Sequence, residues 1–235
     1  RVTATSPHGQ QTSYARHVVL ATPAPAAAAL IANLDGELAA LLRGIGYAAV
    51  TLVHLGLARE AVGHRLDGAG FLAPKGESAV MTGNLWMSAL FPDRAPPGKV
   101  LLTSYLGGAR APRVADWDDR RLVDETIATL RPLVDLRADP EMIRIDRHPQ
   151  ALPQYQGAYQ ARMQAIAKRL EQVPGLHLEA NYRGGVSVRD RLARGQAVAN
   201  EILAASPDRG SLAGIGFRQH RHRRAFFLLP PASAH

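Results

Sequence analysis

The sequence predicts a mixed fold of the α/β or α+β class. Its 235 residues are 46% hydrophobic, which is enough to bury the core of one large domain or of two small ones. Apolar runs typical of strands alternate along the chain with stretches of helical periodicity. The chain has no cysteine, so disulfides, thiolate metal sites and cysteine nucleophiles are excluded. Together these observations favour sheet-containing domains held by hydrophobic packing.

The first part of the chain predicts a hairpin, a strand and two helices. Alternating residues over 2–14 are typical of a β-hairpin. The apolar run 17–22, closed by Pro23, predicts a short buried strand. Short helices are then expected at 26–31 and 37–42.

A block of β-rich segments follows. We expect strands at 48–57, 70–73, 79–86 and 100–106, because Gly and Pro turn signals separate these runs. Successive strands with such short connections predict an antiparallel or mixed sheet.

Helices and strands alternate in the second half of the chain. Asp116 is a good N-cap for a helix over 117–133. The elements expected after it are a strand at 142–145, a helix at 159–170, a strand at 176–178 and a helix at 188–203. The pattern then degrades, and we interpret 206–235 as a disordered or non-native tail.

The formal net charge of +8 is of the kind found in proteins that bind nucleic acids or membranes. Much of this charge lies in 206–235, which holds Arg209, Arg218, Arg221, Arg223 and Arg224 against Asp208. Elsewhere basic residues interleave with acids, so we expect an ordinary solvated surface and no nucleic-acid partner. A basic binding module remains the non-enzyme alternative. It predicts salt-dependent nucleic-acid binding that deletion of 206–235 does not abolish.

Two motifs of ligand-binding type lack the context that they need. Residues 68–73 match G-x-G-x-x-A, but Pro74 follows where a dinucleotide site requires a helix. His220, His222 and His235 could serve as metal ligands, but arginines surround the pair and no carboxylate is nearby. We therefore predict no metal site.

The strand, turn and helix near the C-terminus have two interpretations. Gly185 and Ser187 fit the start of a G-x-S-x-G nucleophile elbow, although Arg189 replaces its second glycine. Alternatively, free N–H groups of Val186, Ser187 and Val188 at the helix start would stabilise an anion, such as a reduced flavin. We favour the second interpretation.

Five segments resemble, in order, the protoporphyrinogen oxidase family of the flavin amine oxidase-like superfamily. They are 17–24 (HVVLATPA), 68–74 (GAGFLAP), 101–108 (LLTSYLGG), 151–155 (ALPQY) and 174–187 (PGLHLEANYRGGVS). The fourth and fifth are the most specific. Order and spacing agree over 15–204, so the chain resembles the C-terminal portion of such an enzyme.

The resemblance implies a division into domains. A mixed-sheet substrate domain at 31–150 would separate two pieces of a Rossmann-like FAD-binding domain, at 1–30 and 151–205. The N-terminal βαβ unit of that domain is missing from the resemblance. Because a flavin needs the phosphate-cradling turn of this unit, we expect the chain alone to bind FAD poorly and to be inactive.

The resemblance also implies chemistry. Members of the family pass hydride from a porphyrinogen to FAD, which O₂ reoxidises, and so form a porphyrin for haem synthesis. Protoporphyrinogen and coproporphyrinogen are both open as substrates. Another flavin amine oxidase-like enzyme, such as an amine oxidase or a carotenoid-desaturase relative, is the alternative. We expect a cytoplasmic protein, with peripheral association at the cytoplasmic face of the inner membrane as a further option for the full-length protein. No run reaches the ~18 apolar residues of a membrane span.

Site residues follow from their positions in the matched segments. The resemblance implies FAD contacts at Ala21, Thr22, Pro23, Asn181, Tyr182, Gly185, Val186 and Ser187. It implies a substrate pocket at Phe71, Leu72 and Tyr105, and it assigns no catalytic residue. Tyr159 stands where the family usually has His, which leaves the exact substrate open.

Overall fold

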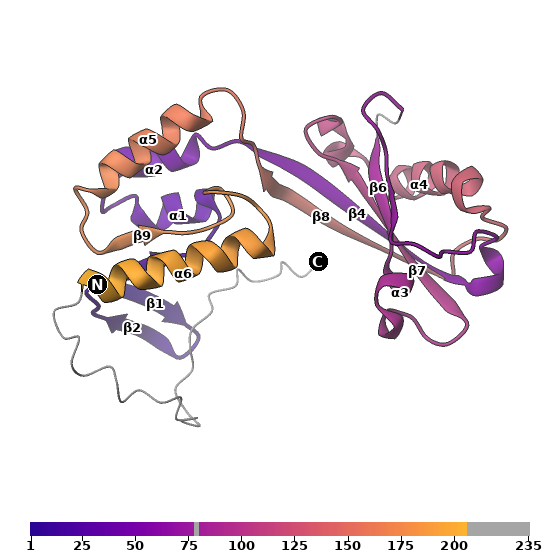
Figure 1. Ribbon diagram of the computed structural model, residues 1–235, viewed down its shortest axis with the longest axis horizontal. Coiled ribbons are helices and arrows are strands. Elements are labelled where there is room, and N and C mark those ends of the chain that lie inside the picture. Colours follow the sequence, from indigo (N-terminus) through magenta and orange to yellow (C-terminus); the bar gives the residue numbers. More distant parts are fainter. Residues whose placement is uncertain (78–79, 206–235) are drawn as a thin grey trace.

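The computed structural model describes residues 1–77 and 80–205 as two lobes (Figure 1). Two long strands, β4 (Tyr47–Ala58) and β8 (Met142–Pro153), run from the first lobe into the second. The predicted tail at 206–235, with its arginines and histidines, lies outside the described residues.

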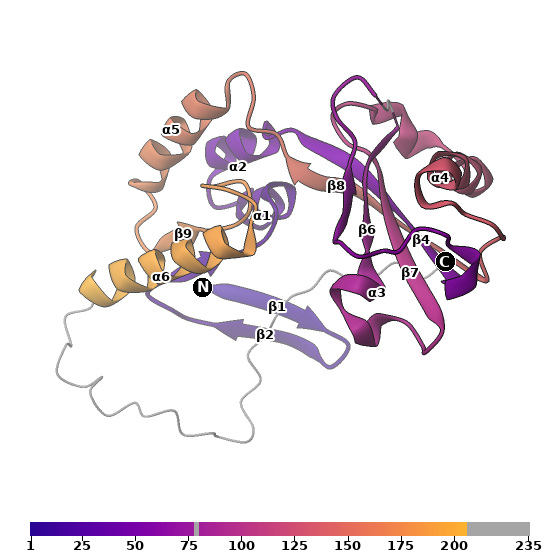
Figure 2. The same ribbon diagram turned by 45° about the vertical axis from the view of Figure 1, so that its right-hand side comes forward.

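The first lobe combines a hairpin, a small parallel sheet and four helices. Strands β1 (Val2–Ser6) and β2 (Gly9–Ser13) form the predicted antiparallel hairpin. It projects from the end of this lobe that is remote from α5 (Figure 2). Strands β3 (Val18–Leu20) and β9 (Leu176–Leu178) pair in parallel. The helices are α1 (Ala24–Ile31), α2 (Gly36–Arg43), α5 (Tyr159–Leu170) and α6 (Val188–Ala205).

The core of the first lobe lies between its helices and β9. Alanines on one face of α1 are fully buried, and their small side chains let α2 pack closely against it. Leu38 and Leu42 of α2 join Ile166 of α5 in this core. The segment that contains α2, which we expected to open the substrate domain, therefore packs with the first lobe.

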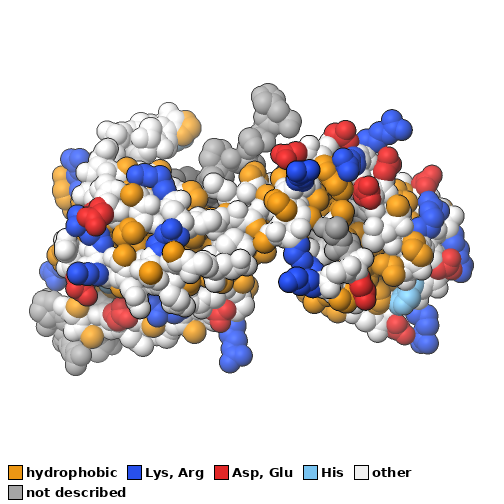
Figure 3. Space-filling model, turned by 90° about the horizontal axis from the view of Figure 1, so that it is seen from above, with side chains coloured by type: hydrophobic (Ala, Val, Ile, Leu, Met, Phe, Trp, Pro, Cys, Tyr) orange, Lys and Arg blue, Asp and Glu red, His pale blue; other side chains and the backbone are white. Residues whose placement is uncertain are grey.

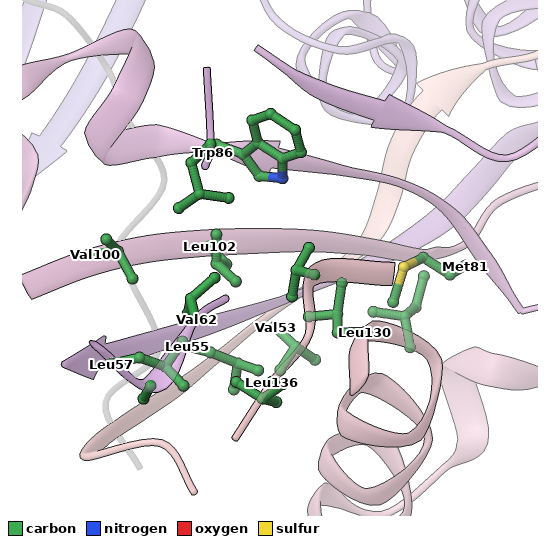
Figure 4. Packing of buried hydrophobic residues seen from close by; sticks show 14 of the residues in the cluster. Val53, Leu55, Leu57, Val62, Met81, Trp86, Val100, Leu102, Leu130 and Leu136 are labelled. Atoms are coloured by element: carbon green, nitrogen blue, oxygen red, sulfur yellow. The ribbon is translucent and has the colours of Figure 1, made fainter. Parts of the chain in front are cut away.

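The second lobe is a five-stranded antiparallel sheet in the order β5-β6-β7-β4-β8. The three strands not yet introduced are β5 (Gly70–Leu72), β6 (Met81–Trp86) and β7 (Lys99–Gly107). Helix α4 (Asp119–Val134) packs on one face, where Figure 4 shows Val53, Leu102 and Leu130 together in the core. The four-residue α3 (Met87–Leu90) follows β6, and 3₁₀ turns occur at Arg59–Ala61, Pro92–Arg94 and Pro112–Asp116.

Strand β8 is longer than the predicted strand at 142–145. Among the described strands it pairs only with β4, so it forms an edge of the sheet. An edge strand tolerates proline, and the register shifts between Ala48 and Val50, opposite Pro149. The second half of β8 is polar and contains prolines, so its sequence lacks the apolar alternation that predicts a strand.

Two further expectations were wrong in detail. The N-cap of α4 is Asp118, whose carboxylate accepts a 2.8 Å hydrogen bond from the Arg121 N–H, and not Asp116, which ends a 3₁₀ turn. Strand β3 is not buried, because Val19 is 44% exposed. Among the described strands β3 pairs only with β9, so its other edge is open.

The surface carries both signs of charge. Lysine and arginine are interspersed with aspartate and glutamate over both lobes on the face that Figure 3 shows. Within the described part of the chain, no helix is long and apolar enough to cross a bilayer.

Candidate functional site

The carboxyl ends of β3 and β9 lie side by side in the first lobe. Their register pairs Leu20 with Leu178, so the segments that follow both strands leave the sheet at the same edge. Ligands of α/β proteins bind at this edge of a parallel sheet. Three predicted cofactor residues, 21–23, follow β3 directly, and Asn181 and Tyr182 follow shortly after β9.

A cavity of about 590 Å³ opens beside these strand ends. Ala21, Pro23 and Asn181 line it from the strand side, and Val198 and Ala199 line it from α6. Most of the lining side chains are small or apolar. The structure thus brings residues from both predicted cofactor segments to one cavity.

Two polar groups beside the cavity are incompletely paired. The buried Thr22 Oγ1 has no hydrogen-bond partner among the described residues. The Asn181 Oδ1 accepts only a long 3.5 Å contact from the Tyr47 hydroxyl, which in turn accepts the Ala24 N–H at the start of α1. Burial of a polar atom without a partner costs about 1–3 kcal/mol. Thr22 itself is not among the residues that line the cavity, whereas Asn181 is.

Tyr182 differs from its expected role. Its side chain is fully buried in the core of the first lobe and does not line the cavity. Burial raises the pKa of the Tyr182 phenol well above its usual range. The residue anchors the chain by packing, and its neighbour Asn181 faces the cavity.

The turn between β9 and α6 depends on two glycines in the left-handed region. Gly184 has φ 72° and Gly185 has φ 114°. A Cβ on Gly185 would lie 2.3 Å from Asp190 Oδ2, so a side chain there would collide with the carboxylate. These glycines let the backbone turn sharply into the helix.

The start of α6 is closed by a capping box. The Ser187 Oγ accepts the Asp190 N–H at 3.1 Å, and the Asp190 carboxylate accepts the Ser187 N–H at 3.3 Å. The Ser187 N–H is therefore not free, contrary to our expectation. The pKa of Asp190 is lowered, chiefly by its hydrogen bond from the Ser187 hydroxyl, so a negative charge already occupies this helix N-terminus. The spacing S-x-x-D in the sequence is a signal that would have revealed this cap.

The nucleophile-elbow interpretation does not fit this geometry. A serine nucleophile needs a base on its hydroxyl, usually histidine. The Ser187 hydroxyl donates at 2.7 Å to Asp190, and no described histidine contacts it. Ser187 thus serves to cap the helix.

Glu179 is a buried carboxylate held by two arginines of α6. It accepts hydrogen bonds from Arg191 and Arg194, each at 3.0 Å, and its side chain is 5% exposed. Arg191 also donates to the backbone carbonyls of Ala180 and Arg183. These contacts fix α6 against the end of β9. The sequence analysis missed Glu179, since the pairing requires knowledge of the turn.

Two tyrosine hydroxyls brace the same turn from the side of α5. Tyr155 donates to the carbonyl of Asn181, and Tyr159 donates to that of Tyr182 at 2.8 Å. The two rings pack edge to face with centroids 4.8 Å apart. The ALPQY segment and the start of α5 thus position the residues that face the cavity.

The predicted substrate residues divide between the two faces of the second lobe's sheet. The register pairs Phe71 with Asn84, on the face that packs against α4. Residues that pair across strands point to the same face. One row of such pairs runs from Leu72 of β5 through Gly83 of β6 and Tyr105 of β7 to Leu52 of β4. Leu72, Leu52 and Tyr105 thus share the opposite face, which we call the open face. Phe71 does not join them.

Leu85 belongs to the open face and was missed from the sequence. It pairs with Gly70 and with Thr103, so it points to the same side as Leu72 and Tyr105. Side chains of a strand alternate between faces, and only the register shows which residues share one. The open face therefore presents Leu52, Leu72, Leu85 and Tyr105.

A model of the flavin containing amine oxidoreductase family matches residues 1–203. This chain belongs to that family. Its members are flavin-containing oxidoreductases, which supports the expected cofactor, FAD. The cavity at the strand ends fits the flat apolar ring of a flavin, because its wall is made mostly of small or apolar side chains and Asn181 adds a polar group with only one long contact of its own.

Curated relatives include two kinds of porphyrinogen oxidase. Coproporphyrinogen III oxidase of Bacillus subtilis is 25% identical over 79% of this chain and 39% of its own length. Chloroplastic protoporphyrinogen oxidase of Nicotiana tabacum is 29% identical over 84% of this chain and 38% of its own length. The chain thus spans about two fifths of the length of these relatives.

Solved structures share the fold at lower identity. A reduced UDP-galactopyranose mutase superposes with a TM-score of 0.68 and 13% identity, over 86% of this chain and 44% of the other. A structure from Exiguobacterium sp. 255-15, described as a protoporphyrinogen oxidase, gives a TM-score of 0.65 and 21% identity, over 83% and 42%. These similarities establish the fold, and the family membership rests on the sequence.

Proposed function

We propose that this chain supplies the substrate face and part of the FAD site of an oxidase that converts protoporphyrinogen or coproporphyrinogen to the porphyrin. The observation that carries the proposal is the open face, whose apolar side chains are half-buried or exposed and lie on the sheet that β4 and β8 join to the cofactor lobe. A porphyrinogen is a large apolar ring that needs such a surface. The names of the relatives above support this substrate class.

In this proposal the strand ends of the first lobe hold the flavin. Ala21, Thr22 and Pro23 would contact it from the β3 side, and Asn181, Gly185 and Val186 from the β9 side. Bound FAD supplies the two-electron oxidation. Asn181, which lines the cavity and makes only a 3.5 Å contact to Tyr47, would offer its amide to the flavin ring.

The open face would hold the macrocycle by apolar contact. Leu72 and Leu85 would pack beside the ring of Tyr105, and Leu52 would continue this surface toward β8. Phe71 would support the sheet from the opposite face, where it packs partly buried against the core that includes α4. Contact with the sheet also removes water from one side of the ring, which strengthens the electrostatic interactions made there.

The test is oxidation by the FAD-loaded protein expressed from the complete gene. Porphyrin fluorescence is followed in air after addition of protoporphyrinogen or coproporphyrinogen. We expect fluorescence to grow faster than autoxidation with at least one substrate, and the preferred one identifies the subtype. A protein that retains FAD but oxidises neither porphyrinogen would contradict the proposal. Oxidation of an amine instead would assign it to another branch of the family.

A further inference from the structure

The open face carries a polar row beside its apolar residues. His54 of β4 lies two residues along from Leu52, on the same face of the sheet. The register places it between Thr103 of β7 and Arg144 of β8. Asp146 lies opposite Leu52 on β8, next to Arg144 on the same face. Three neighbouring strands thus each contribute a polar side chain to one patch.

His54 and Asp146 are fully engaged in this patch. The His54 Nδ1 is 2.9 Å from Thr103 Oγ1, and its Nε2 is 3.2 Å from Asp146 Oδ2. The side chains of His54 and Asp146 are only 20% and 32% exposed. Neither has a ring nitrogen or a carboxylate oxygen without a partner.

Arg144 is held by Asp146 but not saturated by it. Its Nε is 3.0 Å from one carboxylate oxygen of Asp146, and its Nη2 is 3.0 Å from the other. The hydrogen bonds from Arg144 keep the pKa of Asp146 below its usual value, so the carboxylate stays ionised and holds the guanidinium. The Arg144 side chain is 70% exposed, and its Nη1 has no partner in the part of the chain that the structure describes.

The Arg144 guanidinium is thus held in place by Asp146, and its exposed N–H groups are available to a ligand. A guanidinium binds a carboxylate through paired N–H groups, and a fixed guanidinium loses less entropy on binding than a free one. We propose that Arg144, positioned by Asp146 and His54, binds a carboxylate side chain of the macrocycle. The inference rests on the proposed function, since it names the part of that substrate which this chain recognises by charge.

The separation of the apolar and charged parts suits an amphipathic ring. Arg144 lies two strands across and two residues along from Tyr105, which corresponds to about 12 Å from the spacing and rise of an antiparallel sheet. A macrocycle lying over Leu52 and Tyr105 would extend a carboxylate arm toward the edge strand. Both porphyrinogens under test carry such arms.

The chain offers a matched control in Arg137. This arginine also pairs with an aspartate two residues away, Asp135, and its side chain is 60% exposed. It lies between α4 and β8, outside the sheet. The variants Arg144→Gln and Arg137→Gln therefore remove equivalent surface ion pairs, of which only one lies on the open face.

The experiment measures kcat/KM for coproporphyrinogen and binding of coproporphyrin and its neutral tetra-amide, all with FAD-loaded protein from the complete gene. We expect R144Q to lower kcat/KM and coproporphyrin affinity by about tenfold or more, the effect of losing one charge-assisted hydrogen bond, and to leave tetra-amide affinity unchanged. R137Q should match the wild type in all three measurements.

Two outcomes would overturn the inference and leave the proposed function intact. One is an R144Q protein that oxidises coproporphyrinogen and binds coproporphyrin like the wild type. The other is an equal loss of affinity for coproporphyrin and for the tetra-amide, which would indicate a change of the sheet and not of charge recognition. A wild-type protein that retains FAD but oxidises no porphyrinogen would contradict the proposed function itself.

Discussion

The carboxylate of Glu179 is the anchor of the turn that leads into α6. It sits at the end of β9 and is 5% exposed, yet it faces two arginines at 3.0 Å. Such a pair stabilises a fold little relative to an apolar substitute, but loss of one partner leaves buried charge unpaired. Glu179 therefore determines the position of α6 more than it contributes net stability.

Glu179→Gln should lower the free energy of unfolding by about 3 kcal/mol, because Arg191 and Arg194 lose their counter-ion in a largely buried setting. Urea unfolding of the chain measures this loss. Asp124→Asn is the control, since the Arg120–Asp124 pair is exposed and should contribute less than about 0.5 kcal/mol. Equal losses in the two variants would show that Glu179 is not an anchor.

The capping box at the start of α6 was visible in the sequence, whereas the clamp on Glu179 was not. Ser187 and Asp190 stand at the spacing of an N-terminal cap, and the distance between them alone predicts it. Glu179 and Arg191 are 12 residues apart in the sequence, well beyond the three or four that separate neighbours on a helix. They meet because Gly184 and Gly185 let the chain turn between them. Local hydrogen bonds can be inferred from spacing, but contacts across a turn require its geometry.

Two helices of the first lobe are joined by one carboxylate. Asp35 caps α2 by accepting the Leu38 N–H at 2.9 Å, and it also accepts a 2.7 Å hydrogen bond from Arg169 at the end of α5. The hydrogen bond from Arg169 is the largest cause of the lowered pKa of Asp35. The same side chain thus stabilises a helix start and a helix–helix contact.

The contribution of Asp35 to stability should depend on pH. Because its pKa is lower in the folded chain, the contribution is complete above the unfolded pKa of about 3.9 and is lost as the pH falls through the folded pKa. Asp35→Asn should therefore be less stable than the wild type at neutral pH, and the difference should shrink below about pH 4. Denaturant unfolding across pH 3–7 measures it. A difference that grows on acidification would contradict this assignment.

The order of strands and helices followed from the sequence, but the faces of the sheet did not. Phe71 and Leu72 are adjacent and both apolar, yet Phe71 packs partly buried against the core and Leu72 is 82% exposed. A strand of three residues gives too little alternation to assign a face. The patch of His54, Asp146 and Arg144 likewise needs the register between β4 and β8, which no sequence pattern gives.

The assignment of the open face gives contrasting expectations for Tyr105 and Phe71. Tyr105→Ser should raise KM for the porphyrinogen about tenfold with little loss of stability, because the ring is half-buried and faces the proposed substrate. Phe71→Leu should lower the free energy of unfolding by about 1 kcal/mol and leave KM unchanged, since it packs toward α4. Steady-state kinetics and unfolding of both variants decide between the faces. A raised KM for Phe71→Leu together with an unchanged KM for Tyr105→Ser would place the substrate on the opposite face.

At the scale of the whole molecule, residues 1–77 and 80–205 include the proposed place for the flavin ring but show no evident anchor for its phosphates. Anions bind at helix N-termini with free N–H groups. Beside the strand ends, the Ala24 N–H of α1 donates to Tyr47, and the start of α6 carries the Asp190 carboxylate. Since the chain spans about two fifths of its relatives' length, the remainder of such a protein would supply the anchor.

The isolated chain should therefore retain FAD poorly. We expect FAD to be lost from the isolated 235-residue chain on dialysis and to remain bound to the protein expressed from the complete gene. Flavin absorbance after exhaustive dialysis measures both. Stoichiometric FAD in the isolated chain would show that residues 1–235 contain a complete binding site.

Reduction of the flavin by a porphyrinogen tests the proposed function most directly. FAD-loaded protein from the complete gene is mixed anaerobically with coproporphyrinogen or protoporphyrinogen, and the absorbance of oxidised flavin is followed. We predict that one porphyrinogen bleaches the flavin, that a polyamine such as putrescine does not, and that air restores the absorbance. Bleaching by the amine alone, or by neither compound while FAD stays bound, would contradict the assignment of this chain to a porphyrinogen oxidase.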